Sequence, residues 1–503
     1  MIYLPLLIST AVAILAVGSK LWNKMSQSAP LSTIPNIHFS APYSSLFLTF
    51  LKFTGREHRT RYAAHIRCGP VVRVAPNEVS INCIQDGVQT VYGGGFEKGA
   101  WYQNFSNYGK PFMFTMGHTK EHSERKRMLA HVYSKSFVQS STELTKILDM
   151  VLHDRALPIM RRLAKDNTII DIQKENKAFT MDVSTAYFFG RKNGTNFVQN
   201  IKQKALLRDF ELGMSGLFWL AEAPGLVKWC SRFGIKLLSD KVMSSYQIVQ
   251  DLCAELCDRA KEEHIESNGS HPNVYTQLRQ KLQASHGVRE EDLDVTIAAE
   301  MMDHMQAGHE GTGITLTFLM CELSRNPLEL ARLRQELGAL GKTPTAHEVD
   351  SLPFLDAIFM ETMRRYPGAF GPFPRYVPET GANLCGFKVP GGTTVSASVY
   401  CLHRNATVFP DPEMWRPERW IGISDKEKRE MLRWFWVFGS GGRMCIGSHL
   451  ALRMMKTYIV AFYNELDTFI VSDTIFDQVD GLMGAPVGDV VNLGVREIPP
   501  KRM

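Results

Sequence analysis

A proline-free stretch from Glu291 to Ser324 sets the scale of the fold. At 1.5 Å per residue, a helix of this length extends roughly 50 Å. Its middle carries three glycines within six residues, in the segment QAGHEGTGIT at 306–315. Each interior glycine costs a helix about 1 kcal/mol relative to alanine. The glycines therefore indicate either a kink or tight helix crossing, or a flat, bulky ligand against this face, with Glu310 and Thr312 delivering protons beside it.

The remaining chain is mainly helical in pattern and has few strands. Segment 69–82, GPVVRVAPNEVSIN, has the alternation and turn residues of a β-hairpin. Segment 387–400 predicts a second pair of strands, with residues 390–392 as their turn. No internal repeat or second linker interrupts the chain, and hydrophobic residues make up 44% of it. The sequence therefore predicts one large domain that is mainly α with small β-sheets.

Charge and cysteine content narrow the class of protein. A formal charge of +6 over 503 residues, with no dense lysine and arginine run, argues against a dedicated nucleic-acid binder. The nine cysteines are scattered and odd in number, and no spacing suggests a disulfide framework or a zinc site. We therefore expect a reducing compartment.

The N-terminus predicts a membrane anchor. Residues 2–18 are uncharged and mostly aliphatic, and Lys20, Trp22 and Lys24 follow. A helix of that length spans roughly 25 Å, which is workable in a thin reticulum bilayer. A secretory signal peptide is the alternative, but it would have a positive region before the apolar run and a cleavage site after it. We expect residues 1–22 to form a single-pass anchor, 23–44 a linker and 45–503 the cytosolic domain.

One cysteine differs from the rest in its surroundings. Cys445 lies in FGSGGRMCIG at 438–447, among four glycines that leave the backbone bare. Such a loop suits a thiolate that binds iron in a macrocycle, because backbone N–H groups can aim at the sulfur. Arg443 could then meet a carboxylate of the macrocycle, and Phe438 could pack under the ring. The alternative for any single cysteine is a buried thiol.

Two further segments contain charges that could form a network. ETMRRYP places Glu361 and Arg364 three residues apart on one helix face, a spacing that usually only solvates a helix. FPDPEMWRPERW, at 409–420, is rich in proline and carries Arg419 near its end. A buried glutamate bonded to two arginines would lock this segment beside the cysteine loop.

These four motifs, in this order and spacing, resemble those of the cytochrome P450 family of haem-thiolate monooxygenases. The similarity covers the chain from the anchor to the C-terminal strands, and it is closest to membrane-anchored fungal members with roles in specialised metabolism. The resemblance implies that Cys445 is the proximal ligand to the iron of haem b. It also implies that Glu361, Arg364 and Arg419 are the structural triad of the family.

The resemblance implies further contacts with the haem propionates. The family places one arginine before the cysteine, matching Arg443, and another before a strand, matching Arg375 in PRYVPE. A third pair on an early helix usually reads Trp-x-x-x-Arg. The matching stretch HSERKRML offers His122 and Lys126 instead, which still supplies two donors.

The long helix departs from the family pattern at one position. Ala307, Gly308 and Glu310 match it, but Gly311 stands where the family has a threonine that orders water for oxygen activation. Thr312 follows one residue later, which rotates its hydroxyl about 100° around the helix. Thr312 could reach back through a local distortion, or a substrate hydroxyl could replace it. The remaining alternative is a reaction that needs no ordinary oxygen activation.

The implied function is insertion of one atom of dioxygen into a lipophilic small molecule. Electrons would come from NADPH-cytochrome P450 reductase, with cytochrome b5 as an additional partner, at the membrane lipid of the endoplasmic reticulum. Alternatives on the same fold are an isomerase, a desaturase or a ring-rearranging enzyme, and a non-catalytic haem-binding protein. Segment 216–229, apolar and aromatic, falls where the family's access helices dip toward the bilayer, unless it is a core contact. Five basic residues would suit an acidic reductase surface, or simply form a solvated face: Arg125, Arg127, Arg433, Arg453 and Lys456.

Overall fold

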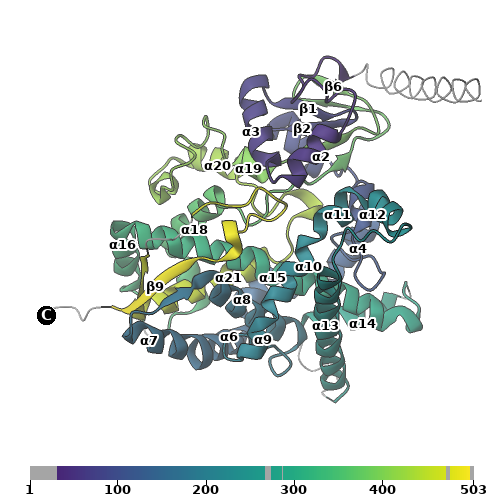
Figure 1. Ribbon diagram of the computed structural model, residues 1–503. Helices are drawn as coiled ribbons and strands as arrows, with labels where there is room; N and C mark the ends of the chain where they lie inside the picture. The colour runs from purple at the N-terminus through teal and green to yellow at the C-terminus, as the bar shows by residue number, and fades with distance from the viewer. Residues whose placement is uncertain (1–30, 267–272, 286, 342, 472–475, 499–503) are drawn as a thin grey trace, which may run out of the picture.

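The expected long helix is α15 (Glu290–Arg325), and it runs through the middle of the protein (Figure 1). The computed structural model describes residues 31–266, 273–285, 287–341, 343–471 and 476–498. Three acidic residues in the first turn of α15 and Arg325 in its last turn complement the helix dipole. α15 ends at Arg325, and Pro327 follows after Asn326. Proline has no amide hydrogen to donate, so it cannot continue the hydrogen bonding of α15.

Two of the three glycines of α15 fit the prediction of a tight helix crossing, and the third does not. The helix is continuous through all three of them. A Cβ atom on Gly308 would lie 2.9 Å from Oγ of Ser184, and one on Gly313 would lie 3.1 Å from Cγ of Lys177. Both neighbours belong to α8 (Ile172–Phe189), so these two glycines allow close helix crossing. Gly311 is different, because a Cβ there would meet no protein atom within 4 Å.

Helices form most of the body, and the strands form three small sheets. Besides α8 and α15, the helices are α2 Leu46–Phe53, α3 Glu57–Cys68, α4 Thr119–Leu129, α5 Lys135–Ser140, α6 Thr142–Asp149, α7 Leu157–Lys165, α9 Ile201–Ala205, α10 Leu207–Ser215, α11 Leu217–Glu222, α12 Pro224–Ser231, α13 Asp240–Glu266, α14 Val274–Ser285, α16 Pro327–Leu337, α17 Ala346–Asp350, α18 Pro353–Arg365, α19 Val399–Leu402, α20 Asp425–Trp434 and α21 Ser448–Glu465. The strands are β1 Val71–Ala75, β2 Glu78–Ile81, β3 Ile169–Asp171, β4 Arg375–Tyr376, β5 Ala382–Leu384, β6 Phe387–Val389, β7 Thr394–Ala397, β8 Leu466–Ile470 and β9 Asn492–Glu497. The mainly α architecture with small sheets is confirmed.

One predicted hairpin forms and the other does not. β1 and β2 pair antiparallel, as segment 69–82 predicts. The second prediction was wrong, because β6 and β7 are strands but not partners. β6 pairs with β5, whereas β7 lies parallel to β2 and antiparallel to β4 in the sheet β1-β2-β7-β4. Residues 390–392 therefore carry the chain from one sheet to another.

The N-terminal predictions fall partly outside the described residues. Residues 1–22, the expected anchor, lie outside them. In the part of the chain that the structure describes, none of the helices combines the length and hydropathy of a membrane span. Part of the expected linker belongs to the fold, because Leu31, Ile34 and Ile37 are buried and Arg73 of β1 exchanges backbone hydrogen bonds with Pro35 and Ile37.

The cysteine spacing suggested no disulfide framework, and the structure corrects this interpretation. Cys83 and Cys385 form a disulfide across 302 residues of sequence, which their spacing could not reveal. Cys385 lies in the turn between β5 and β6, and Cys83 directly precedes residues 84–93. The bond therefore joins the β5–β6 hairpin to the segment that follows β2.

Candidate active site

The cysteine loop, residues 438–447, connects α20 to α21 and is shaped by its glycines. Gly439 and Gly441 have left-handed backbone conformations, with φ of 71° and 68°. At Gly441 a Cβ would lie 2.4 Å from the carbonyl oxygen of Tyr92, so the approach of these two backbones requires glycine. The amide of Cys445 donates to the carbonyl of Phe438 at 2.8 Å and closes the loop.

The environment of Cys445 suits a metal-bound thiolate. Burial raises the pKa of its thiol, whereas the N–H of Gly447, the ammonium of Lys126 and the N–H of Ser448 lower it. As a residue Cys445 is nevertheless exposed, while the other free cysteines of the described residues are buried or half-buried. A metal ion would deprotonate such a thiol, and the two N–H groups would then stabilise the anionic sulfur.

Three cations, Lys98, Arg375 and Arg443, lie near this loop together with the neutral ring of His122, and none of the three forms an ion pair with a residue that the structure describes. Arg375 and Arg443 lower the pKa of Lys98, and Arg375 also lowers that of Arg443. All three cations lower the pKa of His122. Burial lowers the pKa of Lys98 well below its usual range, and Arg375 and Arg443 add to this. Burial and Arg375 bring the pKa of Arg443 to about 10. Burial and Arg443 bring the pKa of His122 to about 3.

Most of these cations bond to neutral groups. Arg443 donates to the carbonyls of Met116 and Gly117, both at 2.6 Å, and Arg375 donates to the hydroxyl of Tyr102 at 2.8 Å. Lys98 donates to the carbonyl of Phe114. His122 Nδ1 is buried and has no partner among the described residues. Surplus positive charge with an orphaned ring nitrogen fits a ligand that carries carboxylates, as haem does.

Lys126 and Phe438, both predicted to contact haem, have protein contacts in this structure, and their roles toward haem stay predictions. Lys126 donates to the carbonyls of Gly442 at 3.0 Å and Met444 at 2.6 Å, and so braces the cysteine loop. Phe438 is half-buried against the main core. Lys98 was not predicted as a site residue. Its only signal in the sequence is a lone lysine in the aromatic segment FEKGAWYQNF.

The structure brings the three residues of the proposed triad into contact. Both Glu361 and Arg364 are fully buried on α18, and their side chains form two bonds of 2.9 Å. Nε of Arg419 donates to the same carboxylate at 2.9 Å, and the indole of Trp420 donates at 3.0 Å. Arg364 also donates to the carbonyl of His403 at 3.0 Å. This network holds the meandering segment that leads to the cysteine loop.

Glu310 joins a buried ammonium that also meets two other carboxylates. Nζ of Lys177, on α8, lies 3.5 Å from Glu310, 3.1 Å from Glu211 of α10 and 3.2 Å from Asp489. Burial raises the pKa of Glu211 to about 7, although Lys177 lowers it. The sequence offered no signal for this network, because its members lie on four separate segments.

Thr312 and Gly311 lie on different sides of α15. Ala307 is exposed and Gly311 half-exposed, one turn apart on one face. Thr312 is buried and lies one turn after Gly308, on the side packed against α8. The continuous helix therefore places the buried Thr312 on a different side from Ala307 and Gly311. Its catalytic role stays a prediction.

The predicted reductase-facing residues do not share one surface. Arg125 is buried against Glu300 at 2.5 Å, and Lys456 is buried between Asp350 and Asp356. Burial in ion pairs removes both from a docking face, whereas Arg127 and Arg433 are exposed.

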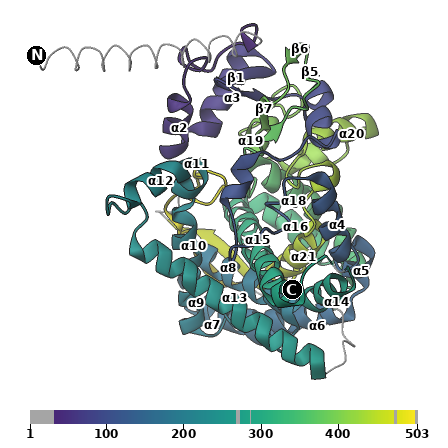
Figure 2. The same ribbon diagram turned by 90° about the vertical axis from the view of Figure 1, so that its right-hand side faces the viewer.

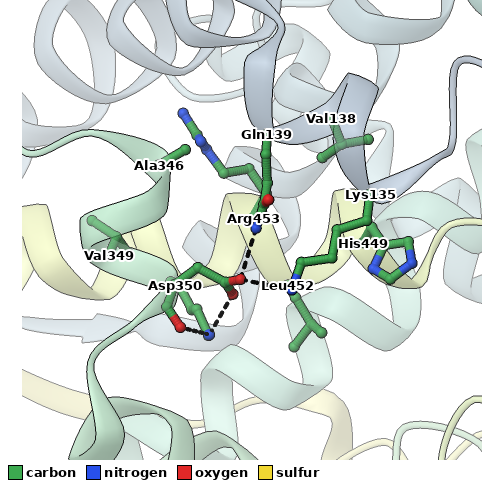
Figure 3. A pocket seen from close by; sticks show the side chains of 10 residues that line it. Lys135, Val138, Gln139, Ala346, Val349, Asp350, His449, Leu452 and Arg453 are labelled. Atoms are coloured by element: carbon green, nitrogen blue, oxygen red, sulfur yellow. Dashed lines mark hydrogen bonds and ion pairs between the residues drawn. The ribbon is translucent and has the colours of Figure 1, made fainter.

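A small surface pocket at α5, α17 and α21 is separate from the cysteine loop (Figure 3). Asp350 lies in it and receives bonds from Lys456 at 2.8 Å and Gln139 at 2.7 Å, with Lys135 at 3.0 Å. Because Asp350 already has these partners, we do not assign the active site to this pocket.

Known proteins resemble this chain over most of its length. The sequence model of the cytochrome P450 family matches residues 44–477. The chain is 28% identical to cytochrome P450 monooxygenase orf2 of Aspergillus niger over 448 residues, covering 86% of this chain and 85% of that protein. It is 28% identical to cytochrome P450 monooxygenase avaI of Aspergillus versicolor over 400 residues, covering 76% and 92%. The match to cytochrome P450 monooxygenase tazI of Aspergillus terreus is 26% over 448 residues, covering 88% of each chain. The chain belongs to the cytochrome P450 family and is an enzyme of the P450 monooxygenase class, which implies a haem held by a cysteine thiolate, a redox partner, a substrate and dioxygen.

Proposed function

We propose that this enzyme inserts one atom of dioxygen into a lipophilic small molecule of fungal secondary metabolism. Its cofactor is haem b, and its electrons come from NADPH-cytochrome P450 reductase, with cytochrome b5 as an additional donor. The observation that carries the proposal is the accessible Cys445 on a glycine loop, beside cations that lack matching anions. Similarity to monooxygenases of Aspergillus supports the fungal context.

Each part of the site has a task toward the cofactor. When bound, haem supplies the redox chemistry that activates dioxygen. Cys445 would hold its iron, and the N–H groups of Gly447 and Ser448 stabilise the sulfur. Lys98, Arg375, Arg443 and the free ring nitrogen of His122 would take up its carboxylates.

Glu310 would hold and release protons. It faces Lys177, whose other two carboxylate partners are about one-third exposed. The chain Glu310, Lys177, then Glu211 or Asp489 connects the interior of α15 to the surface. A pKa of about 7 allows Glu211 to exchange protons with solvent at neutral pH.

Aromatic side chains support a lipophilic substrate. In the loop before α4, Trp101 meets the rings of Tyr102 and Phe105 edge-on, each at 4.9 Å. Phe114 contacts the ring of Tyr102 at 5.2 Å. Such rings bury large apolar area and suit a hydrophobic ligand.

An exposed apolar surface supports a place at the membrane of the endoplasmic reticulum, with the catalytic domain in the cytosol. Phe50 and Phe53 project from α2, and Trp229 from α12. α2 and α11 lie side by side, joined by an ion pair of 2.6 Å between Lys52 and Glu222 (Figure 2). We call this apolar face of α2 and α12 the lipid-facing surface, and α12 belongs to the segment predicted to dip toward the bilayer.

Charged substitutions on this surface weaken membrane binding. The test uses a shortened protein that comprises residues 31–503. We expect Trp229→Glu in this protein to lower partitioning to lipid vesicles about tenfold, because one large aromatic side chain no longer enters the lipid. The measurement is co-sedimentation with phosphatidylcholine vesicles. Leu328→Glu, at an 83% exposed site on α16, is the control and leaves partitioning unchanged. Equal partitioning of both variants would contradict this assignment.

A threonine at position 311 changes how oxygen is used. A Cβ at Gly311 meets no protein atom within 4 Å, so Gly311→Thr fits and places a hydroxyl on the accessible face of α15. We expect more product and less hydrogen peroxide per NADPH consumed. The control Gly311→Ala stabilises the helix by about 1 kcal/mol without a hydroxyl. If both variants change the ratio of product to hydrogen peroxide equally, proton delivery does not depend on a hydroxyl at position 311.

The proposed function is tested by the metabolites that depend on the enzyme. Mass spectrometry compares the native host with and without the gene, and the accumulating substrate is then incubated with the enzyme, reductase and NADPH under isotopically labelled dioxygen. A product with one labelled oxygen atom supports the proposal. A product of unchanged mass, or lacking two hydrogens, favours the rearrangement or desaturation that Gly311 leaves open. Turnover without reductase contradicts the electron route.

A further inference from the structure

One carboxyl group on the accessible face of α15 has no role so far. Asp303, Ala307 and Gly311 follow each other at intervals of four residues, so they share one side of the helix. Ala307 is exposed and Asp303 is half-buried, whereas residues 301, 302, 304 and 305 are buried. Asp303 and Cys445 lie close enough that Asp303 raises the pKa of the thiol. Asp303 therefore belongs to the wall of the active site.

The two other acids on this part of α15 each have a cation. Glu300 bonds to Arg125 at 2.5 Å and accepts the amide of Met113 at 3.1 Å. Glu310 lies 3.5 Å from Lys177. The carboxyl group of Asp303, by contrast, has no hydrogen bond or ion pair to any residue that the structure describes.

Four titratable groups surround Asp303, and none neutralises it. They are Glu300 on the same helix, Lys98 in the loop before α4, Tyr133 after α4, and Cys445. Lys98 bonds to the carbonyl of Phe114 and lies over the rings of Tyr102 and Phe114. Burial, with repulsion from Glu300, raises the pKa of Asp303 to about 8 against the weaker effect of Lys98.

A carboxylate in such a place is costly unless a ligand brings the missing positive charge. The two haem carboxylates would be taken up by the cations near the cysteine loop. Lys98, the cation nearest in effect to Asp303, bonds to the carbonyl of Phe114 instead, so Asp303 keeps no ion-pair partner among the described residues. We infer that Asp303 binds a cationic nitrogen of the substrate, so that the enzyme acts on lipophilic amines and holds them by this charge. This inference rests on the proposed function and names its substrate class.

The test uses the haem-loaded enzyme and a matched pair of ligands. The cation is 4-phenylbutyl-trimethylammonium, and the neutral isostere has carbon in place of nitrogen. The quaternary nitrogen has no lone pair for iron and does not titrate. Isothermal titration calorimetry measures both dissociation constants, and their ratio is the preference for charge. We expect wild-type enzyme to prefer the cation, and Asp303→Asn to lower that preference at least about tenfold.

Control variants distinguish loss of the negative charge at position 303 from a general disturbance of the fold. Asp303→Glu keeps the preference, as does Glu291→Gln at an exposed site in the first turn of α15. In wild-type enzyme the affinity for the cation rises with pH toward a plateau above about 8, because the carboxylate form binds it. In Asp303→Asn this rise is absent.

Two outcomes overturn the inference. One is wild-type enzyme that does not prefer the cation, and the other is Asp303→Asn that retains the preference. In both cases a thiolate-type spectrum of the reduced carbon monoxide complex shows that the haem-thiolate assignment still holds. Loss of that spectrum in wild-type enzyme would instead be a failure of the proposed function.

Discussion

Replacement of Cys445 by alanine abolishes the thiolate-type spectrum of the reduced carbon monoxide complex and all NADPH-dependent turnover. No other free cysteine in the described residues is exposed, so none can take over as ligand. The chain itself should still fold, because the loop closes through a backbone bond from Cys445 to the carbonyl of Phe438. The measurements are the difference spectrum, haem content and circular dichroism.

Another cysteine provides the matched control for this experiment. Cys68 is free and half-buried at the end of α3, away from the cysteine loop. Cys68→Ala should keep both the spectrum and turnover. A thiolate-type spectrum that survives in Cys445→Ala would show that the iron ligand lies elsewhere and would overturn the site assignment.

Neutralising Glu361 produces the largest expected loss of stability. In Glu361→Gln the buried guanidinium groups of Arg364 and Arg419 lose the carboxylate that both bind at 2.9 Å. Uncompensated buried charge of this kind typically destabilises a protein by about 3–5 kcal/mol. We expect a fall of that size in the free energy of unfolding, with little haem retained, because the segment leading to the cysteine loop is no longer held. Urea denaturation and haem content measure both effects.

The control is the same substitution at an exposed ion pair. Glu418 meets Arg332 at 2.9 Å, with each side chain more than 40% exposed. Glu418→Gln should cost at most about 1 kcal/mol and leave haem content unchanged. If Glu361→Gln is no less stable than Glu418→Gln, the buried network does not hold the fold.

The sequence alone was sufficient to predict features whose geometry depends on residues a few positions apart. The proline-free stretch predicted at 291–324 matches α15 (Glu290–Arg325) to within one residue at each end. Glu361 and Arg364 face each other because they are three apart on a helix. The glycines around Cys445 determine a bare loop whatever surrounds it. Helical and turn geometry repeats over a few residues, so these features can be read from spacing.

Only the tertiary structure decided which distant groups meet. Spacing gave no sign that Lys177 would join Glu310 to two other carboxylates, or that Cys83 would bond to Cys385. β6 and β7 look like a hairpin in the sequence, yet each finds its partners in a different sheet. The sequence also could not show that Asp303 lacks an ion-pair partner, because this depends on every residue that packs around it. Partner choice across hundreds of residues depends on how whole elements pack, and no local pattern encodes it.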